Sequence, residues 1–244
     1  MQRIPGPLLF YGTSGKGRAT ARLTRFAIER GFRGIDSALY FRYDEAAVGA
    51  AVAGAIRNGV VRRDDLFLQT KFSPDLGMTV AESFATSLER LRVDAIDSYV
   101  LHAPDVAAWR EMKSLPVRSL GVSNVALGQL EALCAISRPA FVQNRCLAAR
   151  RWDAEVRAFC RAHGIGYQGF SLISANPRVL ESAAVRRIAA RVGRTPAQVV
   201  LRFARQAGIV PLVGTTKRRH MREALAIEDF ELTEDEVARI GRGR

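Results

Sequence analysis

Short apolar, β-branched runs alternate with longer segments of 3.6-residue periodicity from one end of the chain to the other. The expected strands are residues 8–12, 34–36, 66–71, 96–102, 117–121, 141–144, 166–170 and 209–213. The expected helices are residues 19–30, 45–58, 80–91, 106–113, 127–136, 153–163, 185–192 with 196–206, and 219–226, followed by a capped helix within 232–240. A regular βα alternation of this kind predicts an α/β protein with a parallel sheet.

The number of βα units favours one architecture. Eight units of about 30 residues use up nearly all 244 residues, which fits a single-domain (β/α)8 TIM barrel over residues 1–244, a fold of about 250 residues. The rival is a doubly wound open sheet, which normally carries Gly-x-Gly-x-x-Gly after its first strand. Here Gly12-Thr-Ser-Gly-Lys-Gly is only a loose approximation, so a loop-forming role comes before a phosphate-binding one.

Composition excludes several classes of protein. The chain has 48% hydrophobic and 25% charged residues, which argues against disorder and against a disulfide scaffold. It contains no run of about 18 apolar residues and no secretory signal, so we expect a cytoplasmic protein without a membrane span. The three cysteines, Cys134, Cys146 and Cys160, include no Cys-x-x-Cys pair, so we predict reduced packing residues and no metal site.

The charge is strongly basic, because 37 Lys and Arg residues outnumber 24 Asp and Glu residues to give a net charge of +13. Such a balance can indicate nucleic-acid binding. However, the arginines are scattered over every expected helix and no recognition motif accompanies them, which favours a generic basic surface. Lysines occur only at positions 16, 71, 113 and 217, so a lysine inside an apolar strand is unusual in this chain.

Polar residues stand at the carboxyl ends of the expected strands, where a TIM barrel carries its functional groups. They are Asp36, Lys71, His102, Ser123, Asn124, Gln143, Asn144, Phe170 and Ser171. Taken singly, Asp36 could cap a loop and His102 could be a satisfied core histidine. A buried Lys71 is harder to dismiss, because a buried ammonium needs a carboxylate partner. Together they predict an Asp–Lys pair on adjacent strands with a histidine beside it.

This trio suits carbonyl reduction if a tyrosine is near. A lysine beside a tyrosine hydroxyl stabilises the phenolate, so the tyrosine can give a proton to a carbonyl oxygen as the carbon gains hydride. A histidine can orient that carbonyl by a hydrogen bond. Tyr40 and Tyr43 follow the second strand and supply two candidates.

The ordered set of motifs resembles the aldo-keto reductase family over almost the whole chain, as a short, bacterial-type member with truncated substrate loops. The matching segments are Gly34-Ile-Asp36-Ser-Ala, Leu68-Gln-Thr-Lys71, Asp97-Ser-Tyr-Val-Leu-His102, Gly121-Val-Ser-Asn124, Pro139-Ala-Phe-Val-Gln143, Gly164-Ile-Gly-Tyr-Gln-Gly-Phe170-Ser171, Ala197-Gln198-Val-Val-Leu-Arg202, Gly214-Thr-Thr and Phe230-Glu-Leu-Thr-Glu-Asp-Glu. The resemblance implies a catalytic tetrad of Asp36, Tyr43, Lys71 and His102. It also implies a nicotinamide cofactor bound without a Rossmann domain.

The resemblance further implies the cofactor contacts. Ser123, Asn124 and Gln143 would hold the nicotinamide carboxamide, and Phe170 would stack on the ring where the family usually has tyrosine. The pyrophosphate and adenosine phosphate would be held by Ser171, Gly214, Thr215, Thr216, Lys217, Arg218, His220 and Glu223. Gly12 and Thr13 are expected as further cofactor contacts. A 2′-phosphate could be bound by Lys217, Arg218 and Arg219, because phosphate favours cationic donors. The expected cofactor is therefore NADP(H), with NAD(H) as an alternative.

Departures from the family pattern lie at the adenosine end, where His220 and Ala224 stand in place of a usual arginine and asparagine, and in the loops. The tyrosine loop has one extra residue, and the expected position falls between Tyr40 and Tyr43; Tyr43 is preferred because it stands two residues before Glu45, as in a variant branch of the family. Tyr40 stays an alternative, and either could merely line the pocket. The stretches after His102 and Ser174 are short, which predicts an open pocket with loose preference for small or aromatic aldehydes and ketones.

The leading prediction is an NADPH-dependent carbonyl reductase acting on a small molecule, as a monomer or weak homodimer. The alternative is a cofactor-binding, non-catalytic redox sensor or regulatory subunit. A nucleic-acid-binding barrel is the third hypothesis and rests only on the charge of +13.

Overall fold

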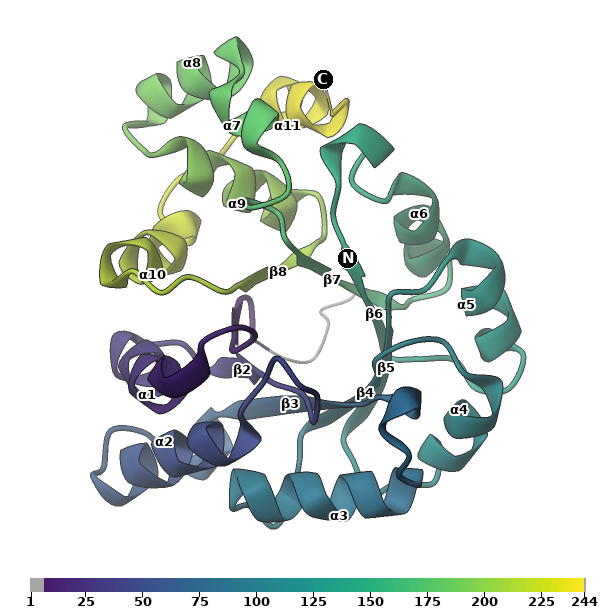
Figure 1. The fold of residues 1–244 in the computed structure, drawn as a ribbon. Coiled ribbons are helices and arrows are strands. Elements are labelled where there is room, and N and C mark those ends of the chain that lie inside the picture. Colours follow the sequence, from purple (N-terminus) through teal and green to yellow (C-terminus); the bar gives the residue numbers. More distant parts are fainter. Residues whose placement is uncertain (1–6, 244) are drawn as a thin grey trace.

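Each strand pairs in parallel with the next one along the chain, and the last strand pairs with the first. In the computed structural model, which describes residues 7–243, this produces a closed barrel in the order β1 to β8 (Figure 1). The strands are β1 (Phe10–Gly12), β2 (Gly34–Asp36), β3 (Phe67–Phe72), β4 (Ser98–Leu101), β5 (Ser119–Ser123), β6 (Phe141–Arg145), β7 (Gly166–Phe170) and β8 (Val210–Val213). The predicted (β/α)8 TIM barrel is confirmed.

Helices surround the strands and cover the outer face of the barrel. They are α1 (Thr20–Arg30), α2 (Glu45–Arg57), α3 (Val80–Leu91), α4 (Val106–Met112), α5 (Leu127–Cys134), α6 (Ala154–Ala162), α7 (Pro177–Glu181), α8 (Ala183–Val192), α9 (Pro196–Gln206), α10 (Arg218–Leu225) and α11 (Glu234–Gly241). Short 3₁₀ turns lie at Gly17–Ala19, Arg63–Asp65, Pro74–Leu76, Ala148–Arg150 and Ala226–Glu228. Helices α3, α9 and α11 begin with capping boxes, in which Thr79, Thr195 and Thr233 pair with Glu82, Gln198 and Glu236.

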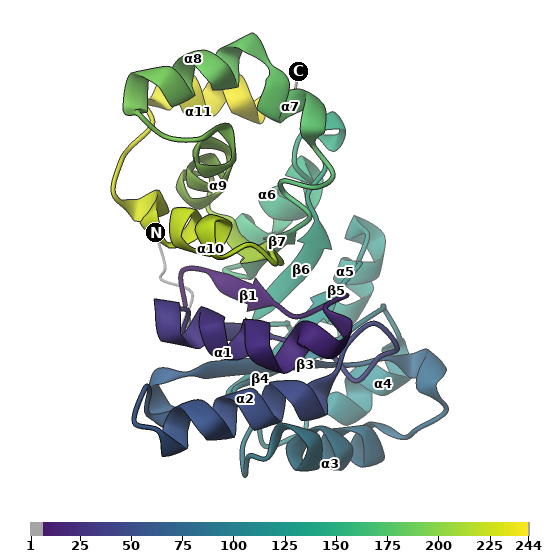
Figure 2. The same cartoon turned by 60° about the vertical axis from the view of Figure 1, so that its left-hand side comes forward.

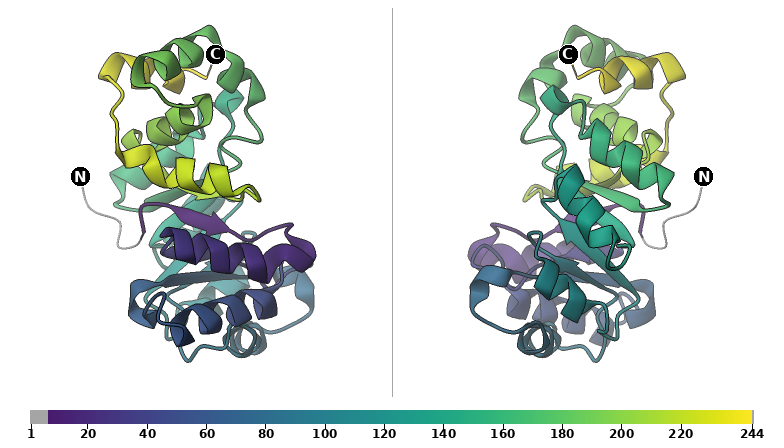
Figure 3. Two further views of the ribbon diagram at one scale, coloured as in Figure 1. Left: turned by 90° about the vertical axis from the view of Figure 1, so that its left-hand side faces the viewer. Right: turned by 90° about the vertical axis from the view of Figure 1, so that its right-hand side faces the viewer.

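The C-terminal third of the chain adds helices outside the barrel wall. Figure 2 and Figure 3 show α8 and α11 side by side beyond α9, with α7 at one end of this group. Sequence periodicity missed α7 because five residues are too few to show it. Among residues 7–243, no helix is both long and apolar enough to cross a membrane.

Two shifts in strand boundaries matter for the site. β5 runs from Ser119 to Ser123 instead of ending at residue 121, because Ser119 pairs with Ser98 and Ser123 pairs with Gln143. β4 ends at Leu101, so His102 is the first residue after the strand. Both polar side chains are therefore carried at the carboxyl rim, and the loop from β4 to α4 has only four residues, 102–105.

Candidate active site

A cavity of about 720 Å³ opens at the carboxyl ends of the strands, where the TIM-barrel rule places function. Its lining includes most of the residues that the sequence indicated, from β1, β2, β5, β6 and β7, from the loop after β4, and from the segment after β8 through α10. The residues implied by the resemblance that line it are Gly12, Asp36, Tyr43, His102, Ser123, Asn124, Gln143, Phe170, Ser171, Gly214, Thr215, His220 and Glu223.

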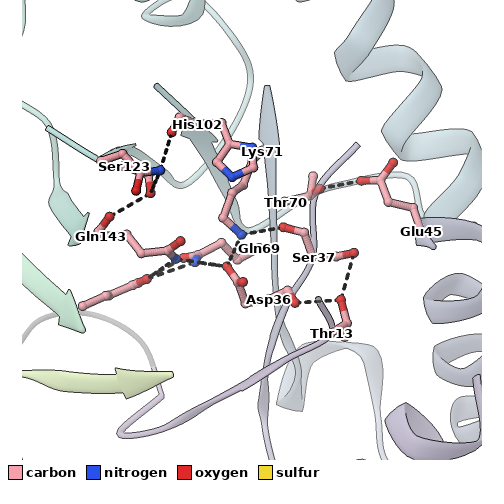
Figure 4. A network of polar contacts seen from close by, with 12 residues as sticks. Thr13, Asp36, Ser37, Glu45, Gln69, Thr70, Lys71, His102, Ser123 and Gln143 are labelled. Carbon is pink, nitrogen blue, oxygen red and sulfur yellow. Dashed lines mark hydrogen bonds and ion pairs between the residues drawn. The ribbon is translucent and has the colours of Figure 1, made fainter. Parts of the chain in front are cut away.

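Asp36 and Lys71 form a buried ion pair at the floor of this cavity (Figure 4). Lys71 Nζ lies 2.7 Å from Asp36 Oδ1 and also donates to the backbone oxygen of Ser37 at 2.7 Å. Lys71 is only 1% exposed and Asp36 only 2%, so each charge is withdrawn from water and is stabilised mainly by the other. The pairing predicted from adjacent strands is present.

Three glutamines fill the barrel interior beneath the pair. Gln69 and Gln143 each donate from Nε2 to Asp36 Oδ1, at 2.7 and 3.0 Å, and both also donate to Gln168 Oε1. Gln168 Nε2 donates back to Gln69 Oε1 at 3.0 Å. Asp36 Oδ1 thus accepts from two amides and one ammonium, which fixes the position of Lys71.

His102 projects into the cavity beside the ion pair and is held from both ends. Its Nδ1 lies 2.7 Å from the hydroxyl of Ser73, and its backbone oxygen accepts from Asn124 Nδ2 at 2.9 Å. Burial, reinforced by the positive charge of Lys71, lowers the pKa of His102 from 6.5 to about 4. The imidazole is therefore neutral around pH 7.

The two candidate tyrosines differ in what they contact. The Tyr40 hydroxyl donates to Asp75 Oδ2 at 2.8 Å, and this hydrogen bond is the main cause that raises the pKa of Tyr40. The Tyr43 ring centroid lies 5.2 Å from Lys71 Nζ and 6.2 Å from the His102 ring centroid. Tyr43 therefore faces the ion pair, whereas the Tyr40 hydroxyl is committed to the loop after β3, although the Tyr40 ring is also 5.2 Å from the His102 ring.

The end of the tyrosine loop is anchored by the first residues of α2. Asp44 caps the helix by accepting from Ala47 N at 2.9 Å. The buried Glu45 accepts from the hydroxyls of Thr70 on β3 and Ser87 on α3 (Figure 4 shows the Thr70 contact). Burial raises the pKa of Glu45. These contacts fix the chain two residues after Tyr43.

A group of amide and hydroxyl side chains lies at the ends of β5 and β6. Ser123 Oγ donates to the backbone oxygen of Gln143 at 2.8 Å, and Asn124 Nδ2 donates to Ser123 Oγ at 3.2 Å. Gln143 Nε2 donates to Asp36 and Gln168 inside the barrel, which leaves Oε1 of Gln143 as the atom that can accept from a ligand. Asn124 and Ser171 have positive φ values of 55° and 59°, a costly backbone conformation of the kind that clusters at binding sites.

Comparison with known proteins gives the family. The sequence pattern of the Aldo/keto reductase family matches residues 12–242. An aldo-keto reductase of Mycolicibacterium vanbaalenii is 35% identical over 226 residues, covering 87% of this chain and 78% of that protein. A glyoxal reductase of Bacillus subtilis is 29% identical over 235 residues, covering 92% of this chain and 83% of that protein.

A solved relative agrees with these matches. The crystal structure of a Bombyx mori aldo-keto reductase in complex with NADP has a TM-score of 0.88 and 28% identity to this chain, covering 98% of this chain and 89% of that one. This chain belongs to the aldo-keto reductase family. It is accordingly an NAD(P)H-dependent oxidoreductase.

In this aldo-keto reductase, the expected cofactor contacts in the segments after β1 and β8 divide into two groups. Gly214, Thr215, His220 and Glu223 line the cavity. Four others do not: Thr13, Thr216, Lys217 and Arg218. Thr13 is fully buried and donates to the backbone oxygen of Asp36, and the Arg218 guanidinium lies 4.2 Å from the Phe26 ring centroid on α1.

Several residues of the site were not found by sequence reasoning. Gln69, Gln168 and Ser73 support Asp36 and His102 from below, and strand alternation two residues before Lys71 would have indicated Gln69. Lys16, Arg42 and Arg145 add cations to the cavity wall. Lys16 donates to the backbone oxygen of Gly214, so it bridges the loops after β1 and β8. Its rarity as one of four lysines was the available signal.

Proposed function

We propose that this chain reduces aldehydes or ketones to alcohols with NADPH, with Tyr43 as general acid and Asp36, Lys71 and His102 in support. The observation that carries the proposal is the buried Asp36–Lys71 pair, whose ammonium lies 5.2 Å from the Tyr43 ring and whose neighbour His102 is neutral. NADPH, when bound, supplies the hydride.

The described cavity suits this cofactor. Its volume of about 720 Å³ lies within the usual range for ligand and cofactor sites. Ser123, Asn124 and Gln143 present polar atoms suited to a carboxamide, and the Phe170 ring lines the wall beside them. A crystallised Bombyx mori relative is in complex with NADP, which supports NADP(H) as the ligand of this cavity.

Each residue of the tetrad has a role in moving one proton. The Tyr43 hydroxyl gives its proton to the carbonyl oxygen while the carbonyl carbon takes up the hydride, and the product is the alcohol. The positive charge of Lys71 stabilises the tyrosinate that remains until solvent returns the proton. We assign Ser73 as the donor to Nδ1, so that neutral His102 keeps its proton on Nε2 and donates it to the carbonyl oxygen.

Small or aromatic aldehydes and ketones are the proposed substrates. The loop after β4 has four residues, 102–105, and six residues, 171–176, separate β7 from α7, so little chain is available to wall the pocket. The glyoxal reductase relative supports a small aldehyde as substrate. Strict selectivity for one compound across a carbonyl panel would contradict this part of the proposal.

The experiment is NADPH oxidation with an aromatic aldehyde by wild type, Tyr43→Phe and Tyr40→Phe. Loss of a general acid lowers kcat by about 10²- to 10⁴-fold, so we expect this loss in Tyr43→Phe alone. Loss in Tyr40→Phe alone would move the role to Tyr40. Binding of NADPH by wild type without turnover of any aldehyde would instead support a non-catalytic redox sensor.

The remaining expectations concern setting and partners. We propose a cytoplasmic monomer or weak homodimer without nucleic-acid partners. Ion pairs such as Arg202 with Glu228 and Arg191 with Glu236 support a structural role for part of the basic surface. Titration with DNA near physiological salt tests the point, because non-specific binding weakens steeply as salt rises.

A further inference from the structure

The guanidinium of Arg145 lies beside the aromatic ring of Phe170 at the mouth of the barrel. Parallel pairing of β6 with β7 sets Arg145 opposite Phe170, two residues beyond the pair Gln143 and Gln168, so strand alternation places all four side chains on the same face of the sheet. Gln143 and Gln168 are buried, whereas Arg145 and Phe170 line the cavity. The Arg145 guanidinium is 5.4 Å from the Phe170 ring centroid, within the range of a cation–π contact.

This contact places a positive charge next to the expected nicotinamide site. The carboxamide is expected at Ser123, Asn124 and Gln143, and the ring is expected to stack on Phe170. Gln143 precedes Arg145 by two residues on β6, and Phe170 is the pairing partner of Arg145 on β7. An arginine side chain is charged at every ordinary pH. The register of two strands therefore fixes a permanent cation at the edge of the expected ring site.

No neighbouring carboxylate neutralises this cation. Among residues 7–243, Arg145 forms no ion pair. The ionisable groups on the floor of the cavity add no net charge, because Lys71 pairs with Asp36 at 2.7 Å and the pKa of His102, lowered to about 4, leaves that ring uncharged near pH 7. Arg145 thus supplies an uncompensated positive charge on the Phe170 side of the site.

The two other cations of the cavity wall lie at the loops after β1 and β8. Lys16 donates to the backbone oxygen of Gly214, and a Cβ placed on Gly15 would lie 3.7 Å from the Arg42 guanidinium. The phosphates of the cofactor are expected on this side, and their charge is the same in NADPH and in NADP⁺. Lys16 and Arg42 should therefore act equally on both forms, whereas the nicotinamide ring, which is neutral when reduced and carries one positive charge when oxidised, responds to Arg145.

We propose that Arg145 discriminates between the two redox states of the cofactor, because its guanidinium repels the positively charged oxidised ring and leaves the binding of the neutral reduced ring almost unchanged. The inference rests on the NADPH-dependent function proposed above and adds a specificity-determining residue to it. Arg145 favours loading of the protein with NADPH and release of NADP⁺. The gain lies in cofactor exchange, since the same repulsion opposes formation of the oxidised ring on the protein.

The test measures the Kd of NADPH and of NADP⁺ by calorimetry at low salt, without substrate. Because Arg145 is exposed and water screens its charge, we expect Arg145→Gln to lower the ratio of Kd(NADP⁺) to Kd(NADPH) by about three- to tenfold, mainly through tighter binding of NADP⁺. Arg145→Lys keeps the charge and should retain most of the wild-type ratio. Arg110→Gln, the same charge change on the exposed face of α4, should leave the ratio unchanged. The difference between wild type and Arg145→Gln should shrink as salt rises.

The ratio separates this inference from the proposed function. A ratio that is the same in wild type and Arg145→Gln would overturn the inference, and so would an equal rise of both Kd values, which would assign Arg145 to a part of the cofactor that does not change charge. A ratio that falls as far in Arg145→Lys as in Arg145→Gln would also overturn it, because the charge would then not be the cause. The expected ratios without turnover of any aldehyde would overturn the proposed function alone, and failure to bind either cofactor would overturn both.

Discussion

The Lys71 ammonium and the Asp36 carboxylate lie 2.7 Å apart with both side chains almost completely buried, on neighbouring strands of the barrel. Asp36 Oδ1 also accepts hydrogen bonds from Gln69 and Gln143. The pair is therefore part of the barrel's interior as well as of the active site, and removing either charge has consequences for stability and for activity.

Lys71→Met leaves the Asp36 charge buried without its cation. Removing one partner of a buried pair typically costs about 3–5 kcal/mol, so we expect a loss of this size in the free energy of unfolding. Urea denaturation followed by circular dichroism measures it, and aldehyde reduction should fall strongly in the same variant.

The matched control is Asp36→Asn combined with Lys71→Met. Asparagine keeps an oxygen acceptor for Gln69 and Gln143 but carries no charge, so the double variant should unfold at higher urea than Lys71→Met alone while remaining inactive. If Lys71→Met proves as stable as wild type, loss of the buried cation does not lower the free energy of unfolding by the expected amount.

Helix α2 offers two glycines with opposite expected effects. A Cβ on Gly49 would overlap the backbone of Arg90 and Leu91, so Gly49→Ala forces α2 away from α3 and should destabilise by about 1–3 kcal/mol. A Cβ on Gly54 would meet only the end of the Arg57 side chain at 3.9 Å, so Gly54→Ala should stabilise by up to about 1 kcal/mol through helix propensity. Thermal unfolding distinguishes the two, and a shift of the same sign in both would contradict the packing described.

Sequence reasoning reached the barrel and the Asp36–Lys71 pair because both leave a periodic or chemical signal. Strand alternation fixes which residues face inward, and a lysine in an apolar strand needs a carboxylate. The choice between Tyr40 and Tyr43 left no such signal, because it depends on where the loop after β2 meets Asp75 and Lys71.

Other parts of the site depend on contacts between distant segments. Arg145 lines the cavity, but it is one arginine among many in a chain of net charge +13, so the sequence alone did not identify it as a site residue. Arg218 lies on Phe26 because pairing of β8 with β1 brings α10 beside α1, a closure that no local pattern reveals.

That placement changes what is expected of the basic residues before and within α10. Arg218 packs on Phe26, and Arg219 donates to Glu223 at 2.6 Å, whereas the exposed Lys217 is an N-terminal cap residue of the helix. We therefore expect Lys217→Gln to raise the Kd of NADPH several-fold more than that of NADH, because the 2′-phosphate prefers cationic donors. Arg218→Gln should change the ratio less. Fluorescence titration with both cofactors measures the ratio of the two Kd values. A larger effect of Arg218→Gln than of Lys217→Gln would indicate that Arg218 contacts the 2′-phosphate.

His102 provides a prediction on pH. Its pKa is lowered to about 4, mainly by burial, so its ring should titrate near pH 4 instead of near 6.5. The measurement is the pH dependence of histidine ring signals in NMR, with the His102 signal identified as the one missing in His102→Gln. A midpoint near 6.5 would show that the ring is solvated and would remove the argument that it is neutral during proton transfer.

The same shift has a consequence for stability. Between about pH 6.5 and pH 4 the unfolded chain binds a proton at His102 that the folded chain excludes, so the free energy of unfolding falls as the pH is lowered through this window. His102→Gln removes the titrating group and should therefore lose less stability than wild type from pH 7 to pH 4. Urea midpoints of both proteins across that range measure the difference, and parallel curves would mean that folding does not lower the pKa of His102. Above about pH 6.5 the ring is neutral in both states, so its contribution there is independent of pH, and any remaining slope belongs to other groups.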